Sequence, residues 1–146
     1  MNGDAGLKFH HLGLAALDPQ SAVAFVRQLG YTCATPILDP LQNVYLRWCE
    51  KSGAPSIEIV SPTETDGPLA TILASHPTSF YHICYEVDSS SDEVLNSLSS
   101  AGLRVLTVLP PTPAILFGGR LVSFHFVRGF GLIELVQSVV IGQATQ

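Results

Sequence analysis

The chain has 146 residues, which suits one domain of ordinary size or two small modules that share a core. Its net charge is −5 and its seven basic residues form no run or stripe, which argues against a nucleic-acid partner. Only 13% of the residues are charged whereas 47% are hydrophobic, so we expect a second copy of the chain to cover part of the surface, as in a homodimer.

The N-terminal segment MNGDAGLKFHH has neither the basic region nor the apolar region of a signal peptide. No apolar stretch reaches the roughly 18 residues that a membrane helix needs. We therefore expect a soluble, cytoplasmic protein that does not associate with membranes.

The first half of the chain predicts a strand, a helix and further strands. The strands are expected at 9–16, 31–35, 44–48 and 56–60, where β-branched and aromatic residues cluster. Asp18 is a typical N-cap residue, Pro19 suits the first helical position, and the apolar stripe that follows ends at Gly30. A turn-rich segment and a short helix at 69–74 come next.

The second half repeats this order of elements. Its strands are expected at 80–87, 103–108, 121–127 and 132–136. Its helix is expected at 91–101 and is followed by Gly102. Each half therefore reads β-α-β-β-β, and the sequence predicts an α+β fold built from two βαβββ modules.

Landmarks of the two halves superpose, as expected for an internal repeat. His11 and His82 are 71 positions apart, and Glu58 and Glu134 are 76 positions apart. We place the modules at about 9–61 and 80–137, with a linker at 62–79 and tails at 1–8 and 138–146.

Glu58 and Glu134 lie in the middle of apolar strands, in SIEIVS and LIELVQ. Burial of an ionised carboxylate without a partner costs several kcal/mol, about the stability margin of a whole domain. If the modules pair, strand alternation brings these glutamates together with His11 and His82. The four side chains then predict a divalent-metal site, whose ion compensates the buried carboxylates.

The remaining histidines and the cysteines have simpler interpretations. Three histidines without a counterpart in the other half are taken as structural or surface residues: His10, His76 and His125. Cys33, Cys49 and Cys84 are odd in number and include no Cys-x-x-Cys pair, so we interpret them as reduced core thiols.

The segments HHLGLAALD, SIEIVSP, YHICYEVD and GLIELVQ together resemble the vicinal oxygen chelate superfamily, which has the glyoxalase and bleomycin-resistance fold. The resemblance covers about 9–137 and implies a cupped, mostly antiparallel eight-stranded sheet. With FGGRLVSF included, the chain is most similar to the branch of methylmalonyl-CoA epimerases and glyoxalase-like proteins. The resemblance implies one divalent ion per chain, Zn, Co, Ni, Mn or Fe, bound by His11, Glu58, His82 and Glu134.

The activity that this resemblance implies is metal-dependent isomerisation or epimerisation of a small acyl or keto substrate. The ion would stabilise the enolate or enediolate that forms when a neighbouring C–H loses its proton. Glu134 would act as a base as well as a metal ligand. A CoA or carrier-bound thioester and an intermediate of specialised metabolism are both among the expected substrates.

The chain departs from the epimerases of this branch at the second base. Those enzymes carry a glutamate in the loop before the third strand, whereas ILDPLQNVYLRW offers only Asp39 and Gln42 as candidates. Gln42 cannot be a base, but it can orient a substrate oxygen. Asp39 precedes Pro40, and we favour a turn residue over a base at this position.

Two other functions stay open. A lyase of the glyoxalase I type would use the same four ligands, although no basic cluster suits the carboxylates of glutathione. A non-catalytic binding protein for small molecules such as drugs is the second alternative, but such members of the superfamily typically lack the metal ligands. Extradiol dioxygenases rank last, since they bind iron through two histidines and one carboxylate and are usually longer.

Overall fold

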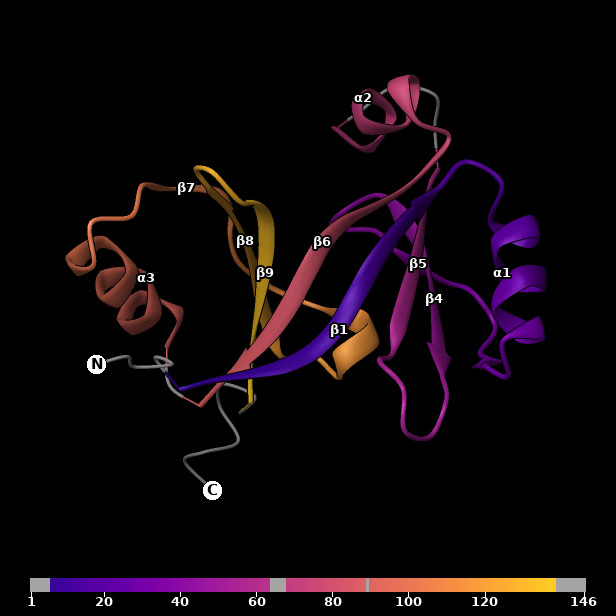
Figure 1. Ribbon diagram of the computed structural model, residues 1–146, viewed down its shortest axis with the longest axis horizontal. Helices are drawn as coiled ribbons and strands as arrows, with labels where there is room; N and C mark the ends of the chain where they lie inside the picture. Colours follow the sequence, from indigo (N-terminus) through magenta and orange to yellow (C-terminus); the bar gives the residue numbers. More distant parts are fainter. Residues whose placement is uncertain (1–5, 64–67, 89, 139–146) are drawn as a thin grey trace. The chain divides into compact units, whose positions relative to one another are not determined.

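The computed structural model describes residues 6–63, 68–88 and 90–138. Their contacts divide into two compact units. The first unit comprises the described residues from 11 to 81, and the second comprises those up to 10 and those from 82 onward. Figure 1 shows the ribbon coloured along the sequence, with labels on the longer strands of each unit.

The first unit contains strands that pair mainly antiparallel. They are β1 (Leu7–Ala16, of which residues 7–10 count with the second unit), β2 (Thr32–Cys33), β3 (Ile37–Asp39), β4 (Val44–Glu50) and β5 (Ile57–Pro62). The strand order is β2-β4-β5-β1, with β3 also paired to β4, and only β5 and β1 are parallel. The helices are α1 (Pro19–Gln28) and α2 (Pro68–Ser75).

The cap of α1 explains where this helix begins. The Asp18 carboxylate accepts hydrogen bonds from the Ser21 backbone N–H at 3.2 Å and from the Ser21 hydroxyl at 2.7 Å. Val23 and Val26 of α1 then pack on Leu14 of β1 and on Ile59 of β5. Helix α1 therefore covers one face of this sheet, as Figure 1 shows.

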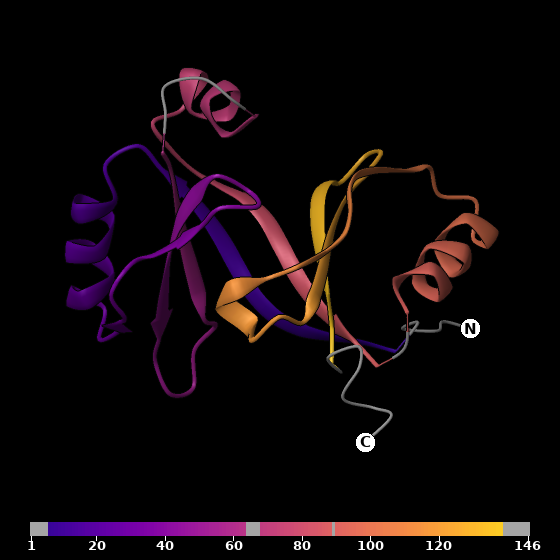
Figure 2. The same cartoon turned by 180° about the vertical axis from the view of Figure 1, so that it is seen from behind.

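The second unit repeats the arrangement. Its elements are β6 (Thr78–Val87, of which residues 78–81 count with the first unit), α3 (Ser91–Ser100), β7 (Val105–Pro113), the short 3₁₀ helix η1 (Ile115–Phe117), β8 (Leu121–Val127) and β9 (Gly131–Gln137). The strand order is β6-β9-β8-β7, and only β6 and β9 are parallel. Val94 of α3 packs on Val87, Ile133 and Leu135, and Figure 2 shows this unit from behind.

The α+β fold with two modules of one helix and several mainly antiparallel strands is confirmed. The strand number was wrong, because the described residues form nine strands and not eight. The additional strand is β3, which has three residues between Pro36 and Pro40 and is too short to show alternation in the sequence. The closure of the modules into a cup and the module limits at 9–61 and 80–137 stay predictions. None of the described helices has the length and apolar character that a membrane span requires.

Candidate metal centre

A His–Glu pair lies on the face of the first unit that α1 leaves uncovered. The parallel pairing of β1 with β5 puts Gly13 opposite Glu58, and His11 is two residues earlier on the same face of β1. His11 Nε2 lies 3.6 Å from Glu58 Oε1, and the two side chains are 0% and 5% exposed. Because Gly13 has no side chain, it leaves room beside the Glu58 carboxylate.

The second unit contains the same pair in the same register. The parallel pairing of β6 with β9 puts Cys84 opposite Glu134, and His82 is two residues earlier on the same face of β6. His82 Nε2 lies 3.0 Å from Glu134 Oε1, with both side chains buried. The internal repeat that the sequence predicts is therefore present in the strand pairing itself.

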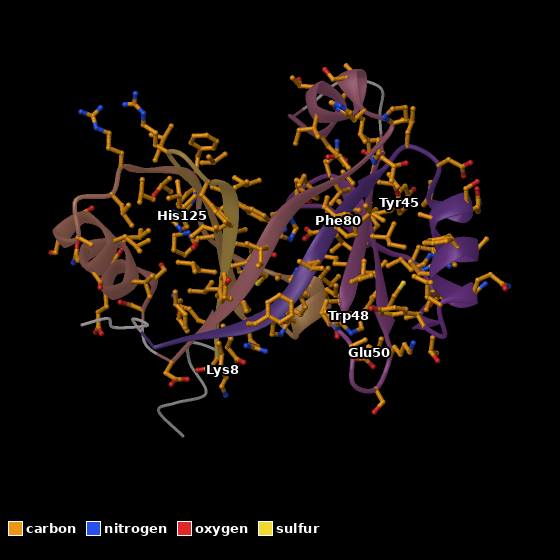
Figure 3. All side chains as sticks on the ribbon, in the orientation of Figure 1. Lys8, Tyr45, Trp48, Glu50, Phe80 and His125 are labelled. Atoms are coloured by element: carbon orange, nitrogen blue, oxygen red, sulfur yellow. The ribbon has the colours of Figure 1, made fainter. Side chains whose placement is uncertain are left out.

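Aromatic rings accompany both pairs, and sequence reasoning missed them. Trp48 of β4 is opposite Glu58, and Phe124 of β8 is opposite Glu134. Each ring meets the histidine of its own unit edge to face, with centroids 5.2 Å apart in both cases. Trp48 Nε1 also donates to Glu50 Oε2 at 2.8 Å, which fixes the indole (Figure 3). The signal was available, since each aromatic residue precedes its glutamate by ten positions.

The spacing within each pair fits two neighbouring ligands of one divalent ion. Ligands about 2.1 Å from a metal lie roughly 3.0 Å apart at a right angle and roughly 3.4 Å apart at the tetrahedral angle. The separation of 3.0 Å in the second unit equals the right-angle spacing, and the separation of 3.6 Å in the first unit is slightly longer than the tetrahedral spacing. Imidazole nitrogen with carboxylate oxygen is a donor set that suits Zn, Co, Ni, Mn or Fe. Each pair can therefore supply two ligands.

Asp39 forms a turn at the end of β3, as we expected from its position before Pro40. Its Oδ1 accepts hydrogen bonds from the backbone N–H groups of Leu41 at 3.0 Å and Gln42 at 3.2 Å. Its Oδ2 accepts one from Gln42 Nε2 at 3.0 Å. The turn interpretation is confirmed, whereas a catalytic role of Asp39 or Gln42 stays a prediction.

The other histidines occupy structural or surface positions. His125 is buried, and its ring nitrogens lie 2.7 Å from Ser123 Oγ and 3.0 Å from Thr107 Oγ1. The ring of His10 packs against Phe117, and His76 is exposed. These positions agree with the interpretation made from the sequence.

An open pocket of about 220 Å³ lies beside α1 in the first unit. Its walls include Pro19, Arg47 and Ile59. Ile59 packs under α1, and Arg47 is its partner across β4 and β5, so both lie on the face opposite to Glu58. The pocket is therefore separate from the His11–Glu58 pair.

Comparisons with known proteins agree with this fold. The family model described as the Glyoxalase/Bleomycin resistance protein/Dioxygenase superfamily matches residues 10–124. No sequence among the curated proteins matches the chain.

Several solved structures are similar to this one. Methylmalonyl-CoA epimerase from Mycobacterium tuberculosis has a TM-score of 0.77 at 18% identity, covering 99% of this chain and 97% of that one. A variant of the Streptomyces coelicolor methylmalonyl-CoA epimerase in complex with 2-nitronate-propionyl-CoA has a TM-score of 0.70 at 21% identity, covering 91% and 98%. A methylmalonyl-CoA epimerase in complex with methylmalonyl-CoA and NH4+ has a TM-score of 0.69 at 21% identity, covering 92% and 96%. At these identities the structures show a common fold, and the family match over most of the sequence shows that the chain belongs to the glyoxalase/bleomycin resistance protein/dioxygenase superfamily.

Proposed function

We propose that the chain is a divalent-metal-dependent isomerase or epimerase that forms an enolate or enediolate from a small acyl or keto substrate. The observation that carries this proposal is the occurrence of a buried His–Glu pair at the same register position in both units, with separations of 3.6 Å and 3.0 Å. A repeat that retains the same pair twice, with an aromatic ring beside each histidine, favours one common task for the two pairs.

In this proposal one ion is held by four side chains: His11, Glu58, His82 and Glu134. A single pair offers only two protein ligands, fewer than the three that a catalytic metal site usually has. Two pairs supply four ligands, and an ion with a fifth or sixth coordination position can then also take substrate oxygens. The same ion compensates both buried carboxylates, which are otherwise costly to bury.

An ion bound there supplies Lewis-acid stabilisation of negative charge on a substrate oxygen. Glu134 is the candidate base that removes the proton from the neighbouring C–H, because its carboxylate lies at the site and is 3% exposed. Asp39 is the candidate for a second base. Gln42 is the candidate for a group that orients the substrate. A second base would make the enzyme an epimerase, whereas a single base suffices for other isomerisations.

A short acyl thioester of CoA or of a carrier is the first substrate class to test. Solved structures with this fold hold methylmalonyl-CoA and 2-nitronate-propionyl-CoA, and the chain shares their fold over nine-tenths of its length. A substrate from specialised metabolism falls in the same class when it has an acidic C–H beside a carbonyl. The proposal includes a homodimer in the cytoplasm, with no nucleic-acid or membrane partner.

Metal analysis tests the shared site. We expect the purified protein to retain about one divalent ion per chain, and His11→Ala and Glu134→Ala each to lose it. His76→Ala is the matched control, since this histidine is exposed and lies outside both pairs. Circular dichroism of each variant separates loss of metal from loss of fold. Unchanged metal content in both ligand variants would sink the proposed site, and about two ions in the wild type would indicate two separate sites.

Solvent exchange tests the reaction. With methylmalonyl-CoA in deuterated buffer, we expect incorporation of deuterium at the acidic carbon in the presence of metal and none after chelation. Turnover of a hemithioacetal without such exchange of the thioester would favour the lyase. Tight binding of acyl or keto compounds without exchange in any of them would favour the non-catalytic binding protein.

A further inference from the structure

Two cysteines of the first unit lie directly opposite each other on neighbouring strands. Cys33 of β2 is the register partner of Cys49 of β4. Cys49 is fully buried in the cluster under α1, and Cys33 is partly exposed and packs against the same cluster. Neither residue belongs to the proposed metal site.

The backbone hydrogen bonds show which kind of cross-strand pair this is. The N–H of Ala34 donates to the carbonyl of Trp48 at 2.8 Å, so Ala34 and Trp48 form a hydrogen-bonded pair. The alternation of an antiparallel ladder then makes Cys33 and Cys49 a pair without backbone hydrogen bonds, in which Cα atoms lie about 4.5 Å apart and side chains are closest. A disulfide needs Cα atoms roughly 4.4–6.8 Å apart, so the backbone need not move to bridge these residues.

Side chains also meet at the equivalent position of the second unit. Thr107 of β7 and His125 of β8 are register partners, and their side chains are hydrogen-bonded at 3.0 Å. His125 and Cys49 are 76 positions apart, the same offset that relates Glu134 to Glu58. The repeat thus places a contacting cross-strand pair in both units, and in the first unit both members are thiols.

The two thiols differ in accessibility. The pKa of the Cys49 thiol is raised to about 12 by burial and by the neighbouring Cys33, with which it is hydrogen-bonded. Cys33 is the more exposed thiol, so a small oxidant in solution reaches Cys33 first.

We propose that Cys33 and Cys49 form a dithiol site that hydrogen peroxide, or another small peroxide, converts to a reversible disulfide. The Cys33 sulfur takes one oxygen from the peroxide and becomes a sulfenic acid, while the O–O bond breaks and one water leaves. The Cys49 sulfur then attacks the Cys33 sulfur, the S–O bond breaks, and the hydroxyl leaves with the Cys49 proton as a second water. Two thiols and one peroxide thus give one disulfide and two waters. A low-molecular-weight thiol reverses the bond by thiol–disulfide exchange.

Thiol counting on the folded full-length chain tests this site. After mild peroxide treatment and alkylation in denaturant, we expect the number of free thiols to fall from three to one, and dithiothreitol to restore three. Cys84→Ser is the matched control, because the register partner of Cys84 is Glu134 and not a cysteine. This variant should still form the Cys33–Cys49 disulfide. Cys33→Ser should retain both of its remaining thiols.

Peptide mapping identifies the bond. Trypsin cuts after Arg47, which lies between the two cysteines, so Cys33 and Cys49 fall in different peptides that only a disulfide can join. We expect this joined peptide after peroxide and its absence in Cys33→Ser and Cys49→Ala. Retention of all thiols under conditions that oxidise free glutathione, or a bridge that includes Cys84, would overturn the proposal. Because Cys33 is only partly buried, Cys33→Ser remains informative even if Cys49→Ala fails to fold.

Discussion

Each buried glutamate has a small residue on one side and an aromatic ring on the other. Glu58 lies between Gly13 of β1 and Trp48 of β4, and Glu134 lies between Cys84 of β6 and Phe124 of β8. The small neighbour leaves space for the carboxylate, and the ring excludes water from it. The surroundings of Glu58 and Glu134 are therefore built for a buried charge that is compensated locally.

His125 should make stability depend on pH. Burial lowers its pKa from the usual 6.5, with Asp92 opposing this shift, so the unfolded chain takes up the proton at a higher pH than the folded chain. The contribution of neutral His125 is therefore fully present above pH 6.5 and is lost as the pH falls below it. We expect the Tm of the wild type to fall more between about pH 7.5 and about pH 5.5 than that of His125→Asn.

His76→Asn is the control for this measurement, because His76 is exposed and should leave the pH dependence as in the wild type. The wild type and His125→Asn both retain the His–Glu pairs. Any loss of metal at low pH is therefore common to them and cancels in the comparison. An equal fall of Tm in the wild type and in His125→Asn would contradict the prediction.

Asp39 offers a way to separate a turn residue from a base. Asp39→Asn keeps an acceptor for the N–H groups of Leu41 and Gln42, whereas Asp39→Ala leaves them without this partner at a buried position. We expect Asp39→Ala to lose about 1–3 kcal/mol of unfolding free energy and Asp39→Asn much less, as measured by denaturant titration. Turnover by the folded Asp39→Asn then tests the base: turnover lost with metal retained supports a two-base epimerase. Loss of turnover only in Gln42→Ala supports substrate positioning by that amide and a one-base isomerase. Equal destabilisation by both Asp39 substitutions would contradict the turn role.

At the scale of elements, alternation and repeat predicted most strands, and β8 runs from Leu121 to Val127 as expected. β7 was expected to end at 108, before the prolines, but it continues to Pro113. It can do so because it is the last strand in the order β6-β9-β8-β7 and its register shifts between Leu109 and Thr112, so that Pro110 and Pro111 have no register partner on β8. The end of such a strand depends on which strand lies beside it, and the local sequence does not show which strand that is.

The two His–Glu pairs of the candidate site were predictable for the same reason that most strands were, whereas their joint binding of one ion stays a prediction. Each unit has a histidine on its first strand and a glutamate on the strand parallel to it, at matching positions: His11 with Glu58, and His82 with Glu134. The same register in both units follows from the repeat. The Cys33–Cys49 contact was not predictable, because the two-residue strand β2 carries no pattern of its own and its register on β4 fixes the contact.

The two main helices differ in their N-caps, which allows a matched test. The Asp18 side chain caps α1 through Ser21, whereas Ser90 at the start of α3 makes no side-chain hydrogen bond to its helix. Asp18→Ala should therefore lower the Tm by roughly 2–4 °C, and Ser90→Ala should lower it by less than about 1 °C. Both can be measured by thermal denaturation at neutral pH. A larger loss in Ser90→Ala than in Asp18→Ala would show that the visible cap does not determine helix stability here.

At the scale of the whole molecule, the surface has few charges and many apolar side chains. Charged residues make up 13% of the sequence, about half of the usual share. Several large apolar side chains of the described residues are more than 60% exposed: Phe25, Leu41, Phe80, Leu106 and Phe130. Single exposed apolar residues are common, but such a number together with so few charges favours burial of part of this surface by a second copy.

We therefore expect the protein to be a dimer in solution. Multi-angle light scattering across micromolar concentrations should give twice the chain mass of 15.6 kDa, with dissociation only on strong dilution. An interface built from apolar side chains should persist when the salt concentration is raised to about 1 M, because salt screens charges and does not weaken apolar burial. Dissociation by salt would instead indicate an interface held by charges, which the seven basic residues are too few to supply widely. A monomer at all concentrations and both salt levels would contradict the expectation and would leave these apolar side chains in contact with water in the folded protein.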